Sequence, residues 1–168
     1  MAPIDTNKLL VLFNYDNFKN KLYVGQFGAQ LIKLNFIINS VDIYEPHIDD
    51  KGIDFIARVN DKNLFEVQVK TVRLKKDSYT FIPKHIWNNE LRKNMYVAFV
   101  VLQQGISPTL LLIPAIAWKT DLTNKIFSDR NYEGKKSKPE WGITLNPKNL
   151  LYLSDKYDFD KTLDKMMK

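Results

Sequence analysis

The sequence predicts a single α/β (α+β) domain in which helices flank a central mixed β-sheet. Three observations predict it: one helical apolar stripe near the start, a series of strand-like segments in the middle, and short amphipathic segments at the end. The 168 residues are 45% hydrophobic and 26% charged, as in globular proteins that bury a core. No repeat or low-complexity linker divides the chain. We therefore expect one domain over residues 1–168, with its core at about 20–145 and a helical tail at about 149–168.

The first predicted helix runs from about Asn20 to Asn39. Its apolar residues recur at steps of three and four and form one stripe: Val24, Phe27, Leu31, Leu34 and Ile38. Gly25 and Gly28 lie inside this segment. Each glycine costs about 1 kcal/mol of helix stability relative to alanine, so we expect both to allow close packing against the sheet.

The strand-like segments follow in a regular order. "VDIYEP" predicts a short strand that ends at Pro46, and residues 53–59 and 64–72 alternate around the turn "NDKN", as in an antiparallel hairpin. "SYTFIP" at 78–83 predicts a further strand, and the apolar segments 95–102 and 109–114 predict strands buried on both faces. "AIAWKTD" predicts a short helix, "NYEGKKSKPEWG" a charged loop, and "ITLN" a minor strand.

The end of the chain predicts short helices. Their inward-facing candidates are Leu150, Leu153, Tyr157 and Phe159. No segment approaches the roughly 18 apolar residues of a membrane span, and the apolar run near the start is short for a signal peptide. We therefore expect a cytoplasmic protein without a membrane partner.

The second strand of the hairpin divides its side chains between two faces, because strand residues alternate with a period of two. Phe65, Val67 and Val69 share an apolar face, which we expect to pack on the first helix. The opposite face carries Glu66, Gln68 and Lys70. Antiparallel pairing across the turn can bring Asp54 within reach of Gln68 and Lys70.

These side chains are the parts that metal-assisted phosphodiester cleavage needs. A hard cation such as Mg²⁺ takes carboxylate and carbonyl oxygens, and a nearby ammonium can stabilise a charged transition state. Asp54 would be the central ligand, Gln68 or Glu66 the second ligand, and Lys70 the group beside the phosphate. A strand with one buried and one solvent-exposed face also alternates apolar and polar residues. An ordinary solvent-exposed sheet face therefore stays an alternative.

The motifs "DDKGIDF" and "EVQVKT" resemble those of the PD-(D/E)XK restriction-endonuclease-like nucleases. The resemblance is to a small branch of uncharacterised bacterial proteins whose second motif reads Gln-X-Lys, and "IPAIAW" and "KPEWGI" are also similar to that branch. It spans about residues 24–145. The resemblance implies a restriction-endonuclease-like fold and Mg²⁺-dependent or Mn²⁺-dependent cleavage of DNA, in bacterial defence or repair.

The same resemblance assigns roles to single residues. Asp54 and Gln68, with Glu66 as a substitute, would bind the metal, and Lys70 would act on the phosphate. The chain departs from the family twice, because Gln68 replaces the usual acid and Gln30 stands where the first helix of many relatives supplies a glutamate. Gln30 would then hold water at the site. Asp50 is a further candidate ligand or a solvated turn residue, and many relatives dimerise.

The charge balance favours a polyanionic partner. Lysine and arginine exceed aspartate and glutamate by 25 to 19, a net charge of +6, and the pI is about 9.3. A basic group follows the hairpin and is predicted to contact DNA phosphates: Arg73, Lys75, Lys76 and Lys84. The alternative for these residues is a solvated sheet edge. The alternative for the whole protein is an inactive nucleic-acid-binding or protein-interaction module on the same fold.

Overall fold

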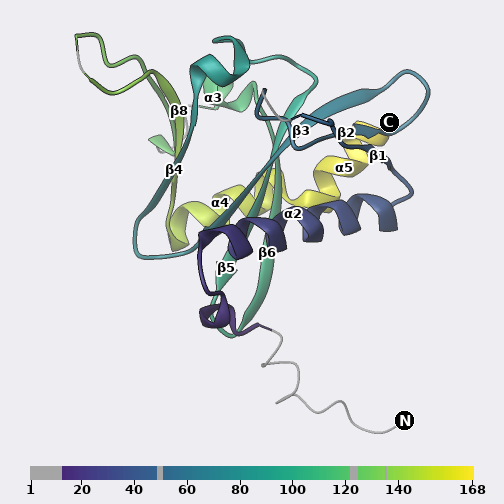
Figure 1. Cartoon of the computed structure of the whole chain (residues 1–168), viewed down its shortest axis with the longest axis horizontal. Helices are drawn as coiled ribbons and strands as arrows, with labels where there is room; N and C mark the ends of the chain where they lie inside the picture. Colours follow the sequence, from purple (N-terminus) through teal and green to yellow (C-terminus); the bar gives the residue numbers. More distant parts are fainter. Residues whose placement is uncertain (1–12, 49–50, 122–124, 135) are drawn as a thin grey trace, which may run out of the picture.

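The strands of the computed structural model form two sheets (Figure 1). The structure describes residues 13–48, 51–121, 125–134 and 136–168. Within these residues, a five-stranded mixed sheet has the order β1 (Asp42–Tyr44), β2 (Phe55–Arg58), β3 (Leu64–Arg73), β5 (Met95–Gln103) and β6 (Ile106–Pro114). A three-stranded antiparallel sheet has the order β4 (Ser78–Pro83), β8 (Glu140–Leu145) and β7 (Phe127–Arg130).

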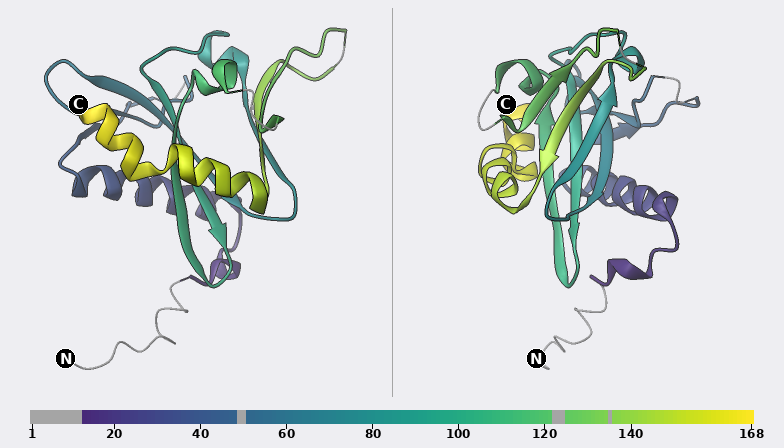
Figure 2. Two further views of the ribbon diagram at one scale, coloured as in Figure 1. Left: turned by 180° about the vertical axis from the view of Figure 1, so that it is seen from behind. Right: turned by 90° about the vertical axis from the view of Figure 1, so that its left-hand side faces the viewer.

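The helices cover both faces of the larger sheet (Figure 2). They are α2 (Lys21–Ile38), the short α3 (Ala117–Thr120), α4 (Pro147–Tyr157) and α5 (Phe159–Met167), with two 3-10 turns, η1 (Tyr15–Asn17) and η2 (Lys84–Trp87). The α+β class with a mixed sheet between helices, predicted from the sequence, is confirmed. Among the described residues, no helix has the length and apolar character needed to cross a bilayer.

Helix α2 begins and ends close to the predicted positions. The Asn20 side chain caps its start by accepting hydrogen bonds from the backbone N–H groups of Leu22 at 2.9 Å and Tyr23 at 3.4 Å. The buried stripe differs from the predicted one: it consists of Val24, Gly28, Ile32 and Phe36, whereas Leu34 and Ile38 are exposed. The helix thus meets the sheet along one row of every fourth residue.

Gly28 lies at the closest approach of α2 to the sheet. A Cβ atom there would lie 1.8 Å from Thr71 Oγ1 on β3, so a side chain does not fit. A Cβ at Gly25 would have no neighbour within 4 Å among the described residues. The packing role predicted for both glycines is therefore confirmed for Gly28 and wrong for Gly25.

Strand β5 is the centre of the core, and its alternate residues enter two different clusters. Ala98, Val100 and Leu102 pack with α2 and α5, whereas Val97, Phe99 and Val101 pack with the second sheet and α4. The two predicted buried strands are thus confirmed as β5 and β6. The four inward candidates of the tail, Leu150, Leu153, Tyr157 and Phe159, are all buried.

The second sheet is the main departure from the prediction of one central sheet. Strand β3 pairs antiparallel with β2 on one side and parallel with β5 on the other, so β4 finds no place beside it. β4 pairs instead with β8, and β8 pairs with β7. Strand β7 was not predicted, and Glu140–Gly142, predicted as loop, begin β8. The smaller sheet faces the Gln68 and Lys70 side of β3.

Candidate functional site

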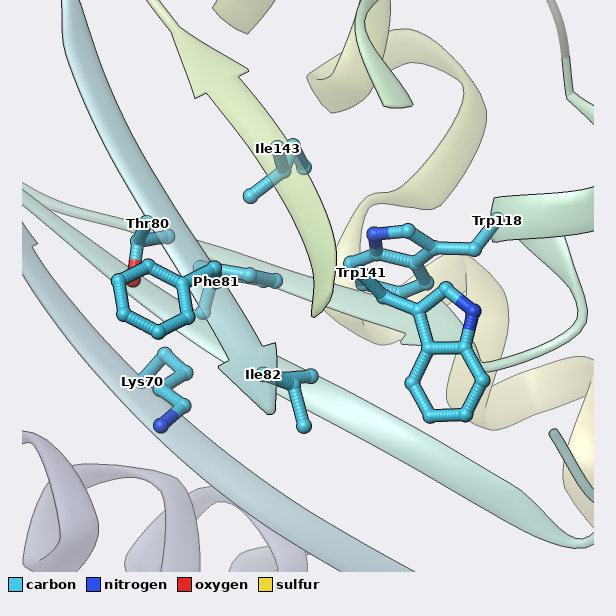
Figure 3. Close-up of a pocket in the computed structure, with 8 residues that line it drawn as sticks. Lys70, Thr80, Phe81, Ile82, Trp118, Trp141 and Ile143 are labelled. Atoms are coloured by element: carbon cyan, nitrogen blue, oxygen red, sulfur yellow. The ribbon is translucent and has the colours of Figure 1, made fainter. Parts of the chain in front are cut away.

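The two faces of β3 point where the alternation predicts. Val67 and Val69 pack in the cluster that contains the buried residues of α2. Lys70 lies on the other face and lines a tight crevice against the second sheet, together with Phe81, Ile82 and Trp141 (Figure 3). The polar residues of β3 are therefore at the junction of the two sheets.

Asp54 lies where the β2–β3 ladder ends. Its backbone N–H donates to the carbonyl of Val67 at 2.9 Å, and its Oδ2 accepts from the backbone N–H of Val69 at 2.6 Å. Strand β2 begins only at Phe55, so the carboxylate takes the place of a strand partner for Val69. The two bonds span Gln68 and hold the carboxylate beside it. The predicted proximity of Asp54 to the Gln-X-Lys segment is therefore present.

Gln68 is buried, with 8% of its surface exposed. Its Oε1 is shielded from solvent and has no hydrogen-bond partner among the described residues. Leaving a buried acceptor unpaired costs about 1–3 kcal/mol. The amide oxygen can therefore accept a cation or a hydrogen bond from a ligand.

Gly52 closes the site above Gln68. It has a φ of +61°, and a Cβ atom there would lie 3.1 Å from Gln68 Nε2 and 2.4 Å from Ile86 Cγ2. The indole N–H of Trp87 donates to the Gly52 carbonyl at 3.5 Å. The turn before Asp54 can therefore lie this close to Gln68 and η2 only with glycine at position 52.

Lys70 stands two residues beyond Gln68, opposite Phe99 of β5 in the parallel register. Figure 3 shows its side chain beside Phe81, with the ammonium end turned away from Trp118 and Trp141. Apolar side chains thus support the stem of Lys70.

Glu66 is engaged differently from Gln68. Its Oε2 forms an ion pair with the Arg92 guanidinium, and both side chains are about a quarter exposed. This pairing compensates the Glu66 charge and ties β3 to the segment before β5. The carboxylate predicted as a substitute ligand is therefore already held by a cation that the sequence pattern did not signal.

Among the described residues, no group of three or more histidine, aspartate or glutamate side chains gathers to hold a metal. The donors on this face are the Asp54 carboxylate and the unpartnered Gln68 carbonyl. Both are oxygen ligands of the kind that Mg²⁺ accepts, since this ion keeps several waters and uses one or two carboxylates. The residues present thus fit a hard cation with few protein ligands. Asp50, the further candidate, lies outside the described residues.

Gln30 is not brought to this group. It is exposed on α2, two residues from both Gly28 and Ile32, which places it on the side of the helix opposite the buried stripe. The helix itself covers the Val67 and Val69 face of β3 and not the Gln68 face. The water-holding role predicted for Gln30 has no support in this arrangement.

Two of the four predicted phosphate contacts are occupied by other partners. Arg73 donates to the Tyr15 carbonyl at 2.7 Å and stacks over Phe18, which ties η1 to β3. Lys84 is 8% exposed; it pairs with Asp129 and donates to Asn131 Oδ1 at 2.6 Å. Lys75 and Lys76 are exposed in the β3–β4 turn and available for phosphate.

Comparison with known proteins gives matches at the level of structure. No family model and no curated protein matches the chain. The bacterial homing endonuclease I-Ssp6803I aligns with a TM-score of 0.49 and 11% identity over 77% of this chain and 77% of its own. The Archaeoglobus fulgidus Holliday junction resolvase Hjc aligns with a TM-score of 0.43 and 10% identity over 75% of this chain and 93% of its own. Neither alignment tests the Gln-X-Lys variant.

Proposed function

We propose that this protein hydrolyses phosphodiester bonds in DNA with the help of Mg²⁺ or Mn²⁺. The observation that carries the proposal is the buried Gln68 carbonyl without a hydrogen-bond partner among the described residues, next to Asp54, whose carboxylate accepts from the Val69 N–H and whose own N–H donates to the Val67 carbonyl. A solvated strand face would leave the amide in water. A buried and unsatisfied oxygen is instead typical of a site that a ligand completes.

The residues would divide the work as follows. Asp54 and Gln68 would hold the cation, which when bound activates water and neutralises phosphate charge. The Asp54 carboxylate is pre-oriented by the Val69 N–H, so little freedom is lost when it binds. Lys70, on the same face, would contact a phosphate oxygen and stabilise the charge that develops on it.

A second candidate, DNA binding without cleavage, is favoured by one observation. The predicted metal-binding set holds two carboxylates, Asp54 and Glu66, and Glu66 is in an ion pair with Arg92. A single carboxylate binds Mg²⁺ weakly unless a phosphate joins its ligands. Both candidate functions predict that the protein binds DNA, and only the first predicts that it cleaves DNA.

The test is cleavage of supercoiled plasmid and of labelled linear and branched DNA with Mn²⁺, Mg²⁺ or EDTA. We expect metal-dependent cleavage that falls at least 100-fold in Asp54→Ala and in Lys70→Met. Lys93→Met, which removes an exposed lysine, is the matched control and should cleave normally. Salt-sensitive DNA binding with no cleavage under any metal would reject catalysis and support the binding module.

The setting of this activity belongs to the same proposal. A role in bacterial defence or repair and a homodimer that cuts both strands follow from the resemblance stated above, and a cytoplasmic location is the expectation drawn from the apolar segments of the sequence. Light scattering with and without DNA measures whether two copies assemble. If the protein is a monomer that cuts one strand, the proposed phosphodiester hydrolysis stands and the proposed homodimer is wrong.

A further inference from the structure

The outer face of the second sheet carries two exposed aromatic rings. Tyr79 and Phe81 are alternate residues of β4, and the two residues are 40% and 47% exposed. Ile82, on the opposite face of the same strand, is buried in the core. Their ring centroids are 6.3 Å apart and their planes differ by 27°. The two rings therefore form an exposed aromatic pair that the core does not use.

The neighbouring strands are shaped to hold this surface. A Cβ atom at Gly142, opposite Phe81 on β8, would lie 1.9 Å from the Tyr79 hydroxyl and 2.6 Å from Ser128 Oγ. The absent side chain lets the Tyr79 ring lie across β8. Its hydroxyl then donates to Glu140 Oε1 at 2.6 Å. Burial, reinforced by Glu140, raises the pKa of Tyr79, so this donor stays protonated.

A cation completes the arrangement. The Arg130 guanidinium lies 4.7 Å from the centre of the Tyr79 ring, and the Glu140 carboxylate that faces it also accepts from Tyr132 at 2.9 Å. Glu140 is thus surrounded by donors and a positive charge, which limits its repulsion of phosphate. Arg130 and Tyr79 are thus in contact, and Phe81, the neighbour of Tyr79, lines the same crevice as Lys70 (Figure 3).

We propose that Tyr79 and Phe81 form a stacking platform for the unpaired bases of a DNA strand whose phosphate reaches Lys70. Aromatic rings bind bases of any sequence through their faces, and arginine beside them adds attraction to the strand. The net charge of +6 and the exposed Lys136 and Lys138 of the β7–β8 connection suit a polyanion. The substrate class is then DNA with a single-stranded segment beside the cleaved bond, which rests on the proposed function.

The experiment measures binding without cleavage. Fluorescence anisotropy in EDTA compares a labelled oligothymidylate with a duplex of equal length, for the wild-type protein, Phe81→Ala and Phe81→Trp. Stacking contributes about 1–3 kcal/mol per base, so we expect Phe81→Ala to weaken oligothymidylate binding about 5-fold to 150-fold. Duplex binding should change less than 2-fold, and Phe81→Trp should bind the single strand at least as well as the wild type.

Two further variants separate stacking from folding. Tyr23→Ala removes a 54% exposed aromatic from α2, on another surface, and should leave both affinities unchanged. Gly142→Ala keeps both rings but displaces Tyr79, and should weaken single-strand binding alone. Circular dichroism verifies the fold of each variant.

The outcomes for the platform and for catalysis are independent. No oligothymidylate binding by the wild type, or an equal affinity in Phe81→Ala, overturns the platform even if duplex DNA is cleaved. Phe81-dependent binding of single strands in a protein that never cleaves supports the platform and overturns only the proposed hydrolysis.

Discussion

The Asp54 carboxylate and the Val69 backbone N–H are joined by a hydrogen bond of 2.6 Å. The orientation of the predicted metal ligand is thus set by the main chain of β3 and not by another side chain. Since main-chain geometry survives most side-chain substitutions, neighbouring residues can be changed without moving Asp54. The first prediction concerns this bond itself.

Replacement of Asp54 separates its structural role from its charge. Asp54→Ala leaves the Val69 N–H without its acceptor and should lower the free energy of unfolding by about 1–3 kcal/mol. Asp54→Asn keeps an oxygen at that place and should lose less stability, yet cleave no DNA because the anionic ligand is gone. Urea unfolding and the plasmid assay test both. Equal stability losses in the two variants would contradict this role of the carboxylate.

We predict that Gln68 lowers the free energy of unfolding relative to an apolar residue and is needed for DNA cleavage. Gln68→Leu removes the unpaired buried carbonyl, so the free energy of unfolding should stay equal or rise by up to about 1–2 kcal/mol while cleavage is lost. Gln68→Glu buries a charge and should unfold more easily in EDTA. Mn²⁺ should stabilise Gln68→Glu more than the wild type, because binding to the folded state alone raises the melting temperature. Absence of any Mn²⁺ effect on Gln68→Glu would exclude Gln68 as a ligand position.

The basic residues after β3 are predicted to fall into two classes. Lys84→Met removes the cation that pairs with Asp129 and the donor to Asn131, and should lower stability by about 1–3 kcal/mol, with little change in DNA affinity. The double variant Lys75→Ala/Lys76→Ala should keep its stability. Its plot of the logarithm of the DNA-binding constant against the logarithm of the salt concentration should become less steep, by about 0.7–0.9 in slope for each lysine removed. Anisotropy titrations over a range of salt concentrations measure the slopes. Loss of DNA affinity in folded Lys84→Met would show the assignment to be wrong.

Two glycines of one helix are expected to respond in opposite directions to alanine. Gly28→Ala forces a Cβ atom against Thr71 and should destabilise the protein by about 1–3 kcal/mol. Gly25→Ala meets open space and should stabilise it by about 0.5–1 kcal/mol, because alanine favours the helix. Thermal and urea unfolding of the pair provide the measurement, each variant serving as the control of the other.

Stability should also fall at alkaline pH. Burial, followed by the bond to Asp121, raises the pKa of Tyr157 above its ordinary 10.0, and its hydroxyl donates to Asp121 Oδ2 at 2.8 Å. A raised folded-state pKa gives stability that is complete below pH 10 and is lost as the pH rises through the folded pKa, because the unfolded tyrosine ionises first. Urea unfolding between pH 8 and 11.5 should show this decline. Tyr157→Phe should reduce its slope, and an unchanged slope would mean that Tyr157 does not contribute.

The sequence by itself determined most of the elements and the two faces of the hairpin. Periods of about 3.6 and 2 placed α2, β2, β3, β5 and β6, and the alternation along β3 separated Val67 and Val69 from Gln68 and Lys70. These features are local, since residues a few positions apart fix which side chains share a face.

Only the tertiary structure decided the partners of those side chains. Sequence cannot show that Glu66 meets Arg92, that Lys84 meets Asp129, or that β4 leaves the main sheet because β5 occupies the place beside β3. It also gave Gln30 a role that its position on the outer side of α2 does not support. Contacts between distant residues depend on how the elements pack, and packing is a property of the whole chain, whereas periodicity is a property of each segment.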